Sequence, residues 1–472
     1  MAFSTAHTRG RRHLPMPIAD QVITAALTAA LAPVAGRRLW IAYSGGLDSH
    51  VLLHAAAGLR RVLGLELCAV HVHHGLQPAA DAWVGHCERV CAELDVPLHT
   101  RRLALAPATG ASPEAVARDA RYGAFRTLLR PGDVLATAQH RDDQAETLLL
   151  ALLRGAGVHG LAAMPARAPL GAGLLLRPLL DLPRAALCAY ADVHGLRWME
   201  DPSNADIALD RNRLRQSIIP QLRRRWPALD KTLSRSAAHC AEAAALLDER
   251  ADELLAVLDT APAGRTQVPV ALSVSGLRRL AGPTQRLVLR RWLQRRGFPL
   301  PNTQRLHRII TELLPAAADR QPLVAWPGCD VRRHRDALYA LPPLPMPPPI
   351  TPLRPVSGTS VLALPAPLGT LSWALTPAAA EVVVSVQFAA VGLRCTRPER
   401  PSATLKALFQ AAGIPAWLRP YVPLLVLDGR LAGVAGVRLC GDAVAWLRWR
   451  GHPWTAQGWL RPLLRRAPID SG

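Results

Sequence analysis

The sequence Ser44-Gly45-Gly46-Leu47-Asp48-Ser49 lies between two apolar runs, residues 39–43 before it and residues 51–53 after it. A buried strand, a glycine turn and an apolar helix in that order place backbone N–H groups at a helix N-terminus, where they can bind a phosphate. Two adjacent glycines let the main chain approach an anion closely, because neither carries a side chain that would collide with it. The two serines add hydroxyl donors, and Asp48 can hold Mg²⁺ or orient the loop. The stretch therefore predicts a phosphate-binding loop.

This loop differs from a Walker-type loop, which requires Gly-x-x-x-x-Gly-Lys-Ser/Thr. No lysine follows Gly46. The pattern instead resembles the PP-loop of enzymes that split ATP into AMP and pyrophosphate. An ordinary strand-to-helix turn that happens to be rich in serine and glycine is the alternative at this point.

Length and charge bound the kind of protein. The chain has 472 residues, of which 50% are hydrophobic, so it is expected to fold into about two to four globular domains. Its 56 basic residues exceed its 35 acidic residues, which gives a net charge of +21. This excess favours a polyanionic partner, with RNA, DNA and an anionic membrane as candidates. No apolar run is long enough for a transmembrane helix, and of the three candidate partners we predict RNA rather than a membrane.

Eight cysteines bear on the cellular compartment. They stand at positions 68, 87, 91, 188, 240, 329, 395 and 440, and none forms a Cys-x-x-Cys motif. Without a clear export signal, this usage predicts reduced, mostly buried thiols of a cytoplasmic protein.

The N-terminal half alternates short apolar runs with helical patterns over residues 15–225. Strands are expected at residues 38–43, 66–72, 98–103 and 133–138, and helices at residues 49–63, 79–94 and 112–129. This alternation predicts an α/β domain with a doubly wound parallel sheet, whose ligand lies at the carboxyl ends of the strands.

Three further segments are expected. Residues 226–340 have a mainly helical pattern, with helices at 233–258, 283–296 and 305–314. Residues 341–353 contain seven prolines, which predict a stiff and extended linker. Residues 354–472 predict a small α+β domain, with strands at 371–375, 382–387, 424–427 and 431–437 and a helix at 402–412.

Clustered histidines end the second expected strand, at His71, His73 and His74. Successive strand residues point to opposite faces, so these side chains cannot all converge on one metal ion. Contact of His71 and His74 with a nucleotide is therefore favoured over metal binding. A plainly structural use of these histidines is the alternative.

Two carboxylates, Asp143 and Glu146, lie in the first turns of the helix that follows the fourth strand, beside the expected phosphate loop. Such a pair can bind Mg²⁺, accept an ammonium group or act as a base. Helix capping is the alternative. A second cationic, glycine-rich turn at residues 154–157 weakens that alternative.

Arginines stand out in two further places. Arg118 shares a helical face with Glu114 and Tyr122, for which a solvated helix with ion pairs is the alternative. A basic stretch of six arginines follows an acidic turn at residues 200–204. These six are Arg211, Arg213, Arg215, Arg223, Arg224 and Arg225.

In this order, the blocks resemble the tRNA(Ile)-lysidine synthetase family of PP-loop enzymes. The matching blocks are residues 44–49, 71–76, 114–122, 140–147, 154–157, 200–204 and 211–215, with further similarity at 324–339 and 405–425. The similarity therefore spans the whole chain. One departure is Gln139, where the family often has a second histidine before His140; it puts in doubt a contact at that position, not the reaction.

The resemblance implies an ATP-dependent modification of tRNA(Ile) with a CAU anticodon. The first-anticodon-position cytidine would be adenylated on its carbonyl oxygen, with release of pyrophosphate. The ε-amine of free L-lysine would then displace AMP and give lysidine, so that the tRNA reads AUA instead of AUG.

The resemblance also implies residue roles. The loop Ser44, Gly45, Gly46, Leu47, Asp48 and Ser49 would bind ATP together with His71 and His74. Asp48 and Asp143 would hold Mg²⁺. Asp143 and Glu146 would anchor and deprotonate lysine, with Arg118 positioned by or against them. The six arginines between Arg211 and Arg225, and the cluster at residues 286–296, would bind the tRNA backbone.

Two other interpretations stay open. The first is another PP-loop tRNA-modifying enzyme, such as a thiolase, although base thiolation commonly uses paired cysteines and the chain has no Cys-x-x-Cys. The second is a non-catalytic basic RNA-binding protein with a degenerate nucleotide fold. Intact Asp48, Asp143 and Glu146 argue against such decay.

Overall fold

The structure divides into two compact units, residues 1–246 and residues 247–472, which we describe separately. It is a computed structural model. It describes residues 18–73, 80–103, 113–201, 206–259, 271–317, 320–347, 351–352, 358–376, 382–390, 392–397, 400–454 and 463–465.

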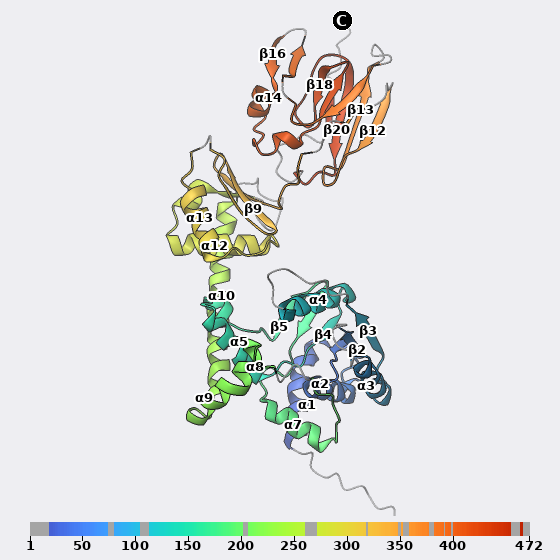
Figure 1. Cartoon of the computed structure of the whole chain (residues 1–472), viewed down its shortest axis with the longest axis vertical. Coiled ribbons are helices and arrows are strands. Elements are labelled where there is room, and N and C mark those ends of the chain that lie inside the picture. The colour runs from blue at the N-terminus through green and yellow to red at the C-terminus, as the bar shows by residue number, and fades with distance from the viewer. Residues whose placement is uncertain are drawn as a thin grey trace, which may run out of the picture. The chain divides into compact units, whose positions relative to one another are not determined.

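A six-stranded sheet forms the centre of the first unit, in the order β3-β2-β1-β4-β6-β5. Figure 1 labels β2, β3, β4 and β5 of this sheet. The strands are β1 (Arg38–Ala42), β2 (Glu66–His73), β3 (Leu98–Arg102), β4 (Val134–Ala136), β5 (Arg167–Leu170) and β6 (Gly173–Leu176). All neighbours pair in parallel except β5, which is antiparallel to β6 at one edge. The chain thus has the predicted doubly wound parallel sheet.

Helices cover both faces of this sheet because its central strand is apolar on both sides. Leu39 and Ile41 of β1 pack in the core formed with α1, α2, α3 and α7, whereas Trp40 faces the core formed with α4. The helices of the unit are α1 (Ile18–Leu31), α2 (Leu47–Leu59), α3 (Ala80–Glu93), α4 (Pro113–Leu128), α5 (Arg141–Leu153), α6 (Val158–Leu161), α7 (Arg184–Val193), α8 (Asp210–Arg213) and α9 (Ile219–Arg225). A 3₁₀ turn, η1 (Ala32–Val34), follows α1, and a π-helical turn, η3 (Leu214–Ile218), joins α8 to α9.

The segment expected to be mainly helical also contains a sheet. Its helices are α10 (Leu229–Leu258), α11 (Val274–Arg278), α12 (Gly282–Arg295) and α13 (Thr303–Arg308), followed by the π-helical turn η4 (Ile309–Leu313). The antiparallel sheet, in the order β7-β10-β9-β8, consists of β7 (Ala271–Ser273), β8 (Leu323–Trp326), β9 (Cys329–His334) and β10 (Ala337–Leu341). Trp292 and Leu289 of α12 pack with Val331 and Leu338 of this sheet. The prediction of a mainly helical segment missed this sheet because its strands are short. Their apolar face is buried against the helices only in the folded protein.

The C-terminal part is richer in strands than the α+β prediction implied. One sheet has the order β11-β14-β17-β18-β19, a second has the order β12-β13-β20-β21, and β15 pairs with β16. The strands are β11 (Thr351–Pro352), β12 (Thr359–Ala363), β13 (Thr370–Leu375), β14 (Val384–Gln387), β15 (Arg394–Arg397), β16 (Arg400–Thr404), β17 (Leu424–Leu427), β18 (Arg430–Val434), β19 (Arg438–Leu439), β20 (Val444–Arg450) and β21 (Leu463–Arg465). The short helices are α14 (Leu405–Ala411) and the 3₁₀ turn η5 (Arg419–Tyr421).

One expectation for this part needs correction. The helix predicted from residue 402 begins at Leu405, because residues 400–404 form β16. The proline-rich stretch at residues 341–353, predicted to be a stiff and extended linker, includes a short edge strand, because Thr351 and Pro352 pair with β14. An edge strand tolerates proline, which cannot donate a ladder hydrogen bond. Pro345 is also held, since its carbonyl accepts a hydrogen bond of 2.6 Å from the Tyr421 hydroxyl.

The prediction of eight reduced thiols is wrong for one pair. Cys395 and Cys440 form a disulfide between residues 45 positions apart. The two cysteines come together only in the folded chain, where β15 lies beside the end of β19. No local sequence pattern predicts this pairing. Cys68, Cys87, Cys91 and Cys329 are free and buried, as expected. The cytoplasmic location itself stays a prediction.

Among the described helices, none is both long and apolar enough to cross a membrane.

Candidate active site

The phosphate loop is closed by its own two serines. Ser49 Oγ accepts a hydrogen bond of 3.2 Å from the Ser44 N–H, lies 3.0 Å from Ser44 Oγ, and donates to the Gly46 carbonyl at 3.0 Å. Helix α2 begins at Leu47, and the first N–H to donate back to the loop is that of His50, which reaches the Gly46 carbonyl. The N–H groups of the first turn therefore lack an acceptor within the helix and form a site suited to an anion.

Gly45 has a backbone that favours glycine, with φ of +83°. A Cβ at this position would lie 3.2 Å from Cys87 Sγ and 3.4 Å from Trp83 Cδ1.

Two contacts hold the phosphate loop against residues 197–199. The Gly45 carbonyl accepts a hydrogen bond of 3.0 Å from the Met199 N–H, and His50 Nδ1 lies 2.9 Å from the Arg197 carbonyl. The segment just before the acidic turn at residues 200–204 thus holds the loop in place. Ser203 and Asn204 of that turn lie outside the described residues.

His140 is the centre of the site, although the sequence motif that contains it predicts no role for it. It precedes α5, and its side chain is 1% exposed. Its Nε2 lies 3.6 Å from Asp48 Oδ2 and 3.4 Å from Asp143 Oδ2, and its Nδ1 lies 3.7 Å from Asp142 Oδ2. His140 therefore joins the phosphate loop of α2 to the predicted carboxylates of α5.

The charges around His140 favour its protonated form. Burial alone would lower the pKa of its imidazole, but the interaction with Asp48 and the charges of Asp143 and Asp142 outweigh burial. The pKa of His140 is therefore raised above the ordinary value of 6.5.

Two arginines of the basic stretch bind the carboxylate pair. Arg215 donates from Nε to Glu146 Oε1 at 2.6 Å and from Nη2 to Glu146 Oε2 at 2.9 Å and to Asp143 Oδ1 at 3.0 Å. Arg211 donates from Nε to Glu146 Oε2 at 2.8 Å. The Glu146 side chain is 1% exposed, and those of Arg211 and Arg215 are 24% and 41% exposed.

A third arginine of the same stretch also has protein partners. Arg223 donates to Asp142 Oδ1 at 2.6 Å and to Asp230 Oδ2 at 2.7 Å. Burial raises the pKa of Asp142, but the hydrogen bond from the Arg184 N–H and the charges of His140 and Arg223 lower it more. Three of the six arginines between Arg211 and Arg225 are thus paired with carboxylates. The other three, Arg213, Arg224 and Arg225, are exposed.

Comparison with known proteins identifies this arrangement. The PP-loop domain matches residues 19–222, the TilS substrate binding domain matches residues 272–339, and the TilS substrate C-terminal domain matches residues 384–451. The tRNA(Ile)-lysidine synthase of Methylococcus capsulatus is 46% identical over 409 residues, which cover 84% of this chain and 90% of that protein. The chain belongs to the tRNA(Ile)-lysidine synthase family.

A second lysidine synthase, from Coxiella burnetii, is 41% identical over 89% of this chain and 91% of that protein. Among solved structures, the U34-tRNA thiolase NcsA from Methanococcus maripaludis has a TM-score of 0.41 and 16% identity, covering 48% of this chain and 80% of that chain. That similarity is too low to bear on the function of this family member.

Arg118 is predicted to lie beside Asp143 and Glu146, but the structure places it elsewhere. Its guanidinium is over the Tyr122 ring, 5.1 Å from the centroid, and in the described structure it makes no ion pair with either carboxylate. Arg211 and Arg215 occupy the place predicted for Arg118. The sequence could not reveal that Arg211 and Arg215 pair with Glu146, because they lie more than 60 positions from it.

The two histidines predicted to contact ATP have different outcomes. His71 points inward, with Nδ1 3.0 Å from the Tyr43 carbonyl, and burial lowers its pKa. This geometry fits the structural use that the sequence left as the alternative, and the predicted contact of His71 with ATP stays a prediction. His74 lies outside the described residues, so its predicted role stays a prediction.

A Mg²⁺ ion would find oxygen ligands at Asp48. Within the described part of the chain, its Oδ1 is buried without a hydrogen-bond donor, and Arg184 Nε lies 3.7 Å from it. Among the described residues, no three His, Cys, Asp or Glu side chains cluster as a metal site. Mg²⁺ commonly uses one or two carboxylates together with substrate phosphates, so Asp48 fits this mode of binding.

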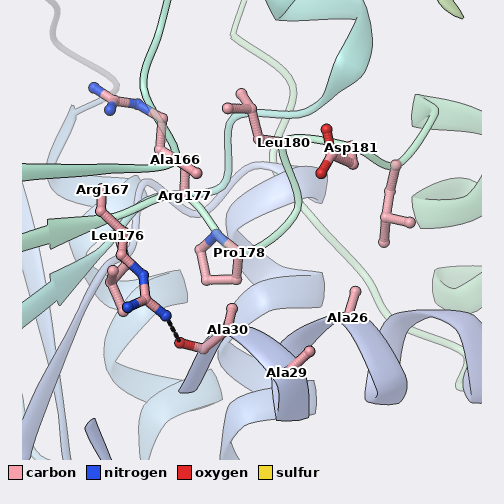
Figure 2. Close-up of a pocket in the computed structure, with 11 residues that line it drawn as sticks. Ala26, Ala29, Ala30, Ala166, Arg167, Leu176, Arg177, Pro178, Leu180 and Asp181 are labelled. Carbon is pink, nitrogen blue, oxygen red and sulfur yellow. Dashed lines mark hydrogen bonds between the residues drawn. The ribbon is translucent and has the colours of Figure 1, made fainter. Parts of the chain in front are cut away.

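One pocket of about 330 Å³ lies between α1 and the β5–β6 hairpin. Figure 2 shows the alanines of α1 on one side of the pocket, and Arg167, Arg177 and Asp181 among the other lining residues. The dashed line is the hydrogen bond from Arg167 Nη2 to the Ala30 carbonyl, at 3.4 Å. None of the predicted site residues lines it. This pocket is therefore separate from the phosphate loop and the carboxylates.

Proposed function

We propose that this protein ligates free L-lysine to the first-anticodon-position cytidine of tRNA(Ile) with a CAU anticodon, at the expense of ATP. The observation that supports this best is the contact through His140, which places Asp48 of the phosphate loop and Asp143 of α5 on the same imidazole nitrogen. A triphosphate on the loop would therefore lie beside carboxylates that can receive an amine.

The first half-reaction forms an adenylated cytidine. The cytidine O2 attacks the α-phosphorus of ATP, the bond to the β-phosphate oxygen breaks, and pyrophosphate leaves. The N–H groups of the first turn of α2 and the hydroxyls of Ser44 and Ser49 bind the departing pyrophosphate. Asp48, and Asp143 as predicted, would hold Mg²⁺, which would neutralise part of the phosphate charge when bound.

The second half-reaction needs a neutral amine. Free lysine carries an ε-ammonium with a pKa of about 10.4, so it must lose a proton before it can attack. The ε-nitrogen then forms a bond to cytidine C2, the C2–O2 bond breaks, and O2 leaves with AMP. Glu146 is buried and suited to hold the ammonium. Asp143, whose Oδ2 lies 3.4 Å from His140 Nε2, would accept the proton.

Exposed cations in both units suit the tRNA backbone. Arg213, Arg224 and Arg225 are exposed in the first unit, as are Arg286 and Arg290 of α12 in the second. Arg291 of α12 is instead paired with Asp248 and Asp252. We accordingly assign residues 226–340 and 354–472 to tRNA binding, and residues 15–225 to catalysis.

Nucleoside analysis tests this function. An unmodified tRNA(Ile) transcript with a CAU anticodon is incubated with the protein, ATP, Mg²⁺ and lysine, and each component is omitted in turn. Lysidine is expected only in the complete mixture. A folded protein that binds the transcript yet forms no lysidine would refute the proposal.

A further inference from the structure

The proposed lysine site is already filled by a side chain of the protein. Arg215 donates three hydrogen bonds of 2.6–3.0 Å to Asp143 and Glu146, the two carboxylates that would receive the lysine ammonium. A guanidinium and a lysine ammonium are both cations that donate to carboxylate oxygens. Glu146 Oε2 already accepts hydrogen bonds from both Arg211 and Arg215. Arg215 also bridges Glu146 to Asp143, so lysine must displace Arg215 to bind between the two carboxylates.

We propose that Arg215 keeps the lysine site closed until tRNA binds, and that its guanidinium then pairs with a phosphate of the tRNA. This inference rests on the proposed function and adds an order to it, in which tRNA binding precedes tight lysine binding.

The exposure of the two partners supports such an exchange. Glu146 is 1% exposed and cannot be reached directly, whereas the Arg215 side chain is 41% exposed. Arg215 therefore covers the buried carboxylate while remaining accessible to an external anion. Arg213, Arg224 and Arg225 are exposed on the same helical segment, and none is paired with a carboxylate in the described part of the chain. These three would attract the polyanion to the segment.

The local backbone provides a means of movement. Arg215 lies in the π-helical turn η3, between α8 and α9. Such turns are rare and are found frequently at functional sites. A change from i→i+5 to i→i+4 hydrogen bonding would rotate Arg215 relative to α8, where Arg211 resides. Arg211 could thus stay on Glu146 while Arg215 leaves.

The exchange avoids an unpaired buried charge. Breaking a buried ion pair by removing one partner is strongly destabilising, because the other charge is left uncompensated. When Arg215 leaves, lysine supplies the replacement cation for Glu146, and the tRNA phosphate supplies a bidentate anion for Arg215. Arg211 remains paired with Glu146 throughout, whereas the second cation of the carboxylate pair and a new anion for Arg215 are both supplied only when tRNA and lysine are present.

Equilibrium dialysis with radiolabelled L-lysine tests this inference. Binding is measured with and without the unmodified tRNA, in the presence of α,β-methylene-ATP, which cannot release pyrophosphate. For the wild-type protein, tRNA should tighten lysine binding by about 5- to 150-fold, the usual range for coupled sites. In Arg215→Gln, lysine should bind without tRNA about as tightly as it binds wild type with tRNA.

Arg223→Gln is the matched control. It removes one cation from the same segment, but Arg223 pairs with Asp142 and Asp230 rather than with Asp143 and Glu146. The tRNA dependence of lysine binding should therefore persist in this variant.

Equal lysine affinity of the wild-type protein with and without tRNA would overturn the inference, whether or not the variants fold. Undetectable lysine binding in the presence of tRNA, or full tRNA dependence in a folded Arg215→Gln variant, would overturn it as well. The same wild-type preparation is assayed for lysidine. If it forms lysidine but its affinity for lysine does not depend on tRNA, only the closure of the lysine site by Arg215 is refuted. Absence of lysidine refutes the proposed function.

Discussion

Nε2 of His140 lies 3.6 Å from Oδ2 of Asp48, across the junction between the phosphate loop and helix α5. This contact joins two motifs that are more than 90 positions apart in the sequence. The charge on His140 therefore affects both the loop that would bind ATP and the carboxylates that would bind lysine.

Protonated His140 should stabilise the fold at lower pH. Because its pKa is raised in the folded state, its contribution to the free energy of unfolding is complete below the unfolded pKa of 6.5 and is lost as pH rises through the folded pKa. The stability difference between wild type and His140→Gln should therefore shrink as pH increases above 6.5. Urea unfolding at a series of pH values measures this difference.

His54→Gln provides the opposite case. Burial lowers the pKa of His54, so its neutral form is favoured in the folded protein and its burial costs stability at acidic pH. The difference between wild type and this variant should grow with pH. Identical pH trends for the two variants would contradict the charge assignment of His140.

Asp143→Asn and Glu146→Gln should separate the half-reactions. Loss of a proton acceptor or of the ammonium-binding carboxylate should slow lysidine formation in a single turnover by about 10²- to 10⁴-fold. Adenylation measured without lysine should be much less affected by Glu146→Gln, because Glu146 does not contact the phosphate loop. Asp230→Asn, which alters only a partner of Arg223, is the control. Normal lysidine formation by both variants would remove the assignment.

Gly45→Ala should damage the phosphate loop. An L-residue with φ of +83° is strained, and the added Cβ would lie 3.2 Å from Cys87 Sγ. We expect a loss of about 1–3 kcal/mol in the free energy of unfolding and weaker ATP binding. Gly58→Ala in α2 is the matched control, since its Cβ would meet nothing within 4 Å. An unaltered affinity for ATP in Gly45→Ala would argue against this loop as the ATP site.

Replacement of exposed arginines should change the salt dependence of tRNA binding. Glutamine at position 213, 224 or 225 cannot neutralise a phosphate, so each substitution should reduce the slope of log affinity against log salt by about 1. Filter binding of the Arg213→Gln, Arg224→Gln and Arg225→Gln variants over a range of salt concentrations gives these slopes. Arg250→Gln removes an exposed arginine that is paired with Glu253 and should leave the slope nearly unchanged. Equal slopes for all four variants would exclude this segment from the tRNA interface.

The sequence predicts the local features of the first unit well. The apolar run at β1 gives a strand buried on both faces, and the glycine turn gives a phosphate loop, because each depends on adjacent residues. The pairing of Glu146 with Arg211 and Arg215 is different, since it spans 65 and 69 positions and has no local signal. The disulfide between Cys395 and Cys440 escapes prediction for the same reason. His140 could have been found, because a histidine that precedes a helix and its two acidic residues is placed to interact with both.

Transfer of label from ATP to tRNA is the sharpest test of the proposed reaction. The protein is incubated with ATP labelled at the α-phosphate, Mg²⁺ and unmodified tRNA(Ile), without lysine. We expect label on the first anticodon cytidine, and its release as AMP when lysine is added, with lysidine formed in equal amount. A tRNA that acquires no label, or a label that added lysine does not release, would rule out this reaction.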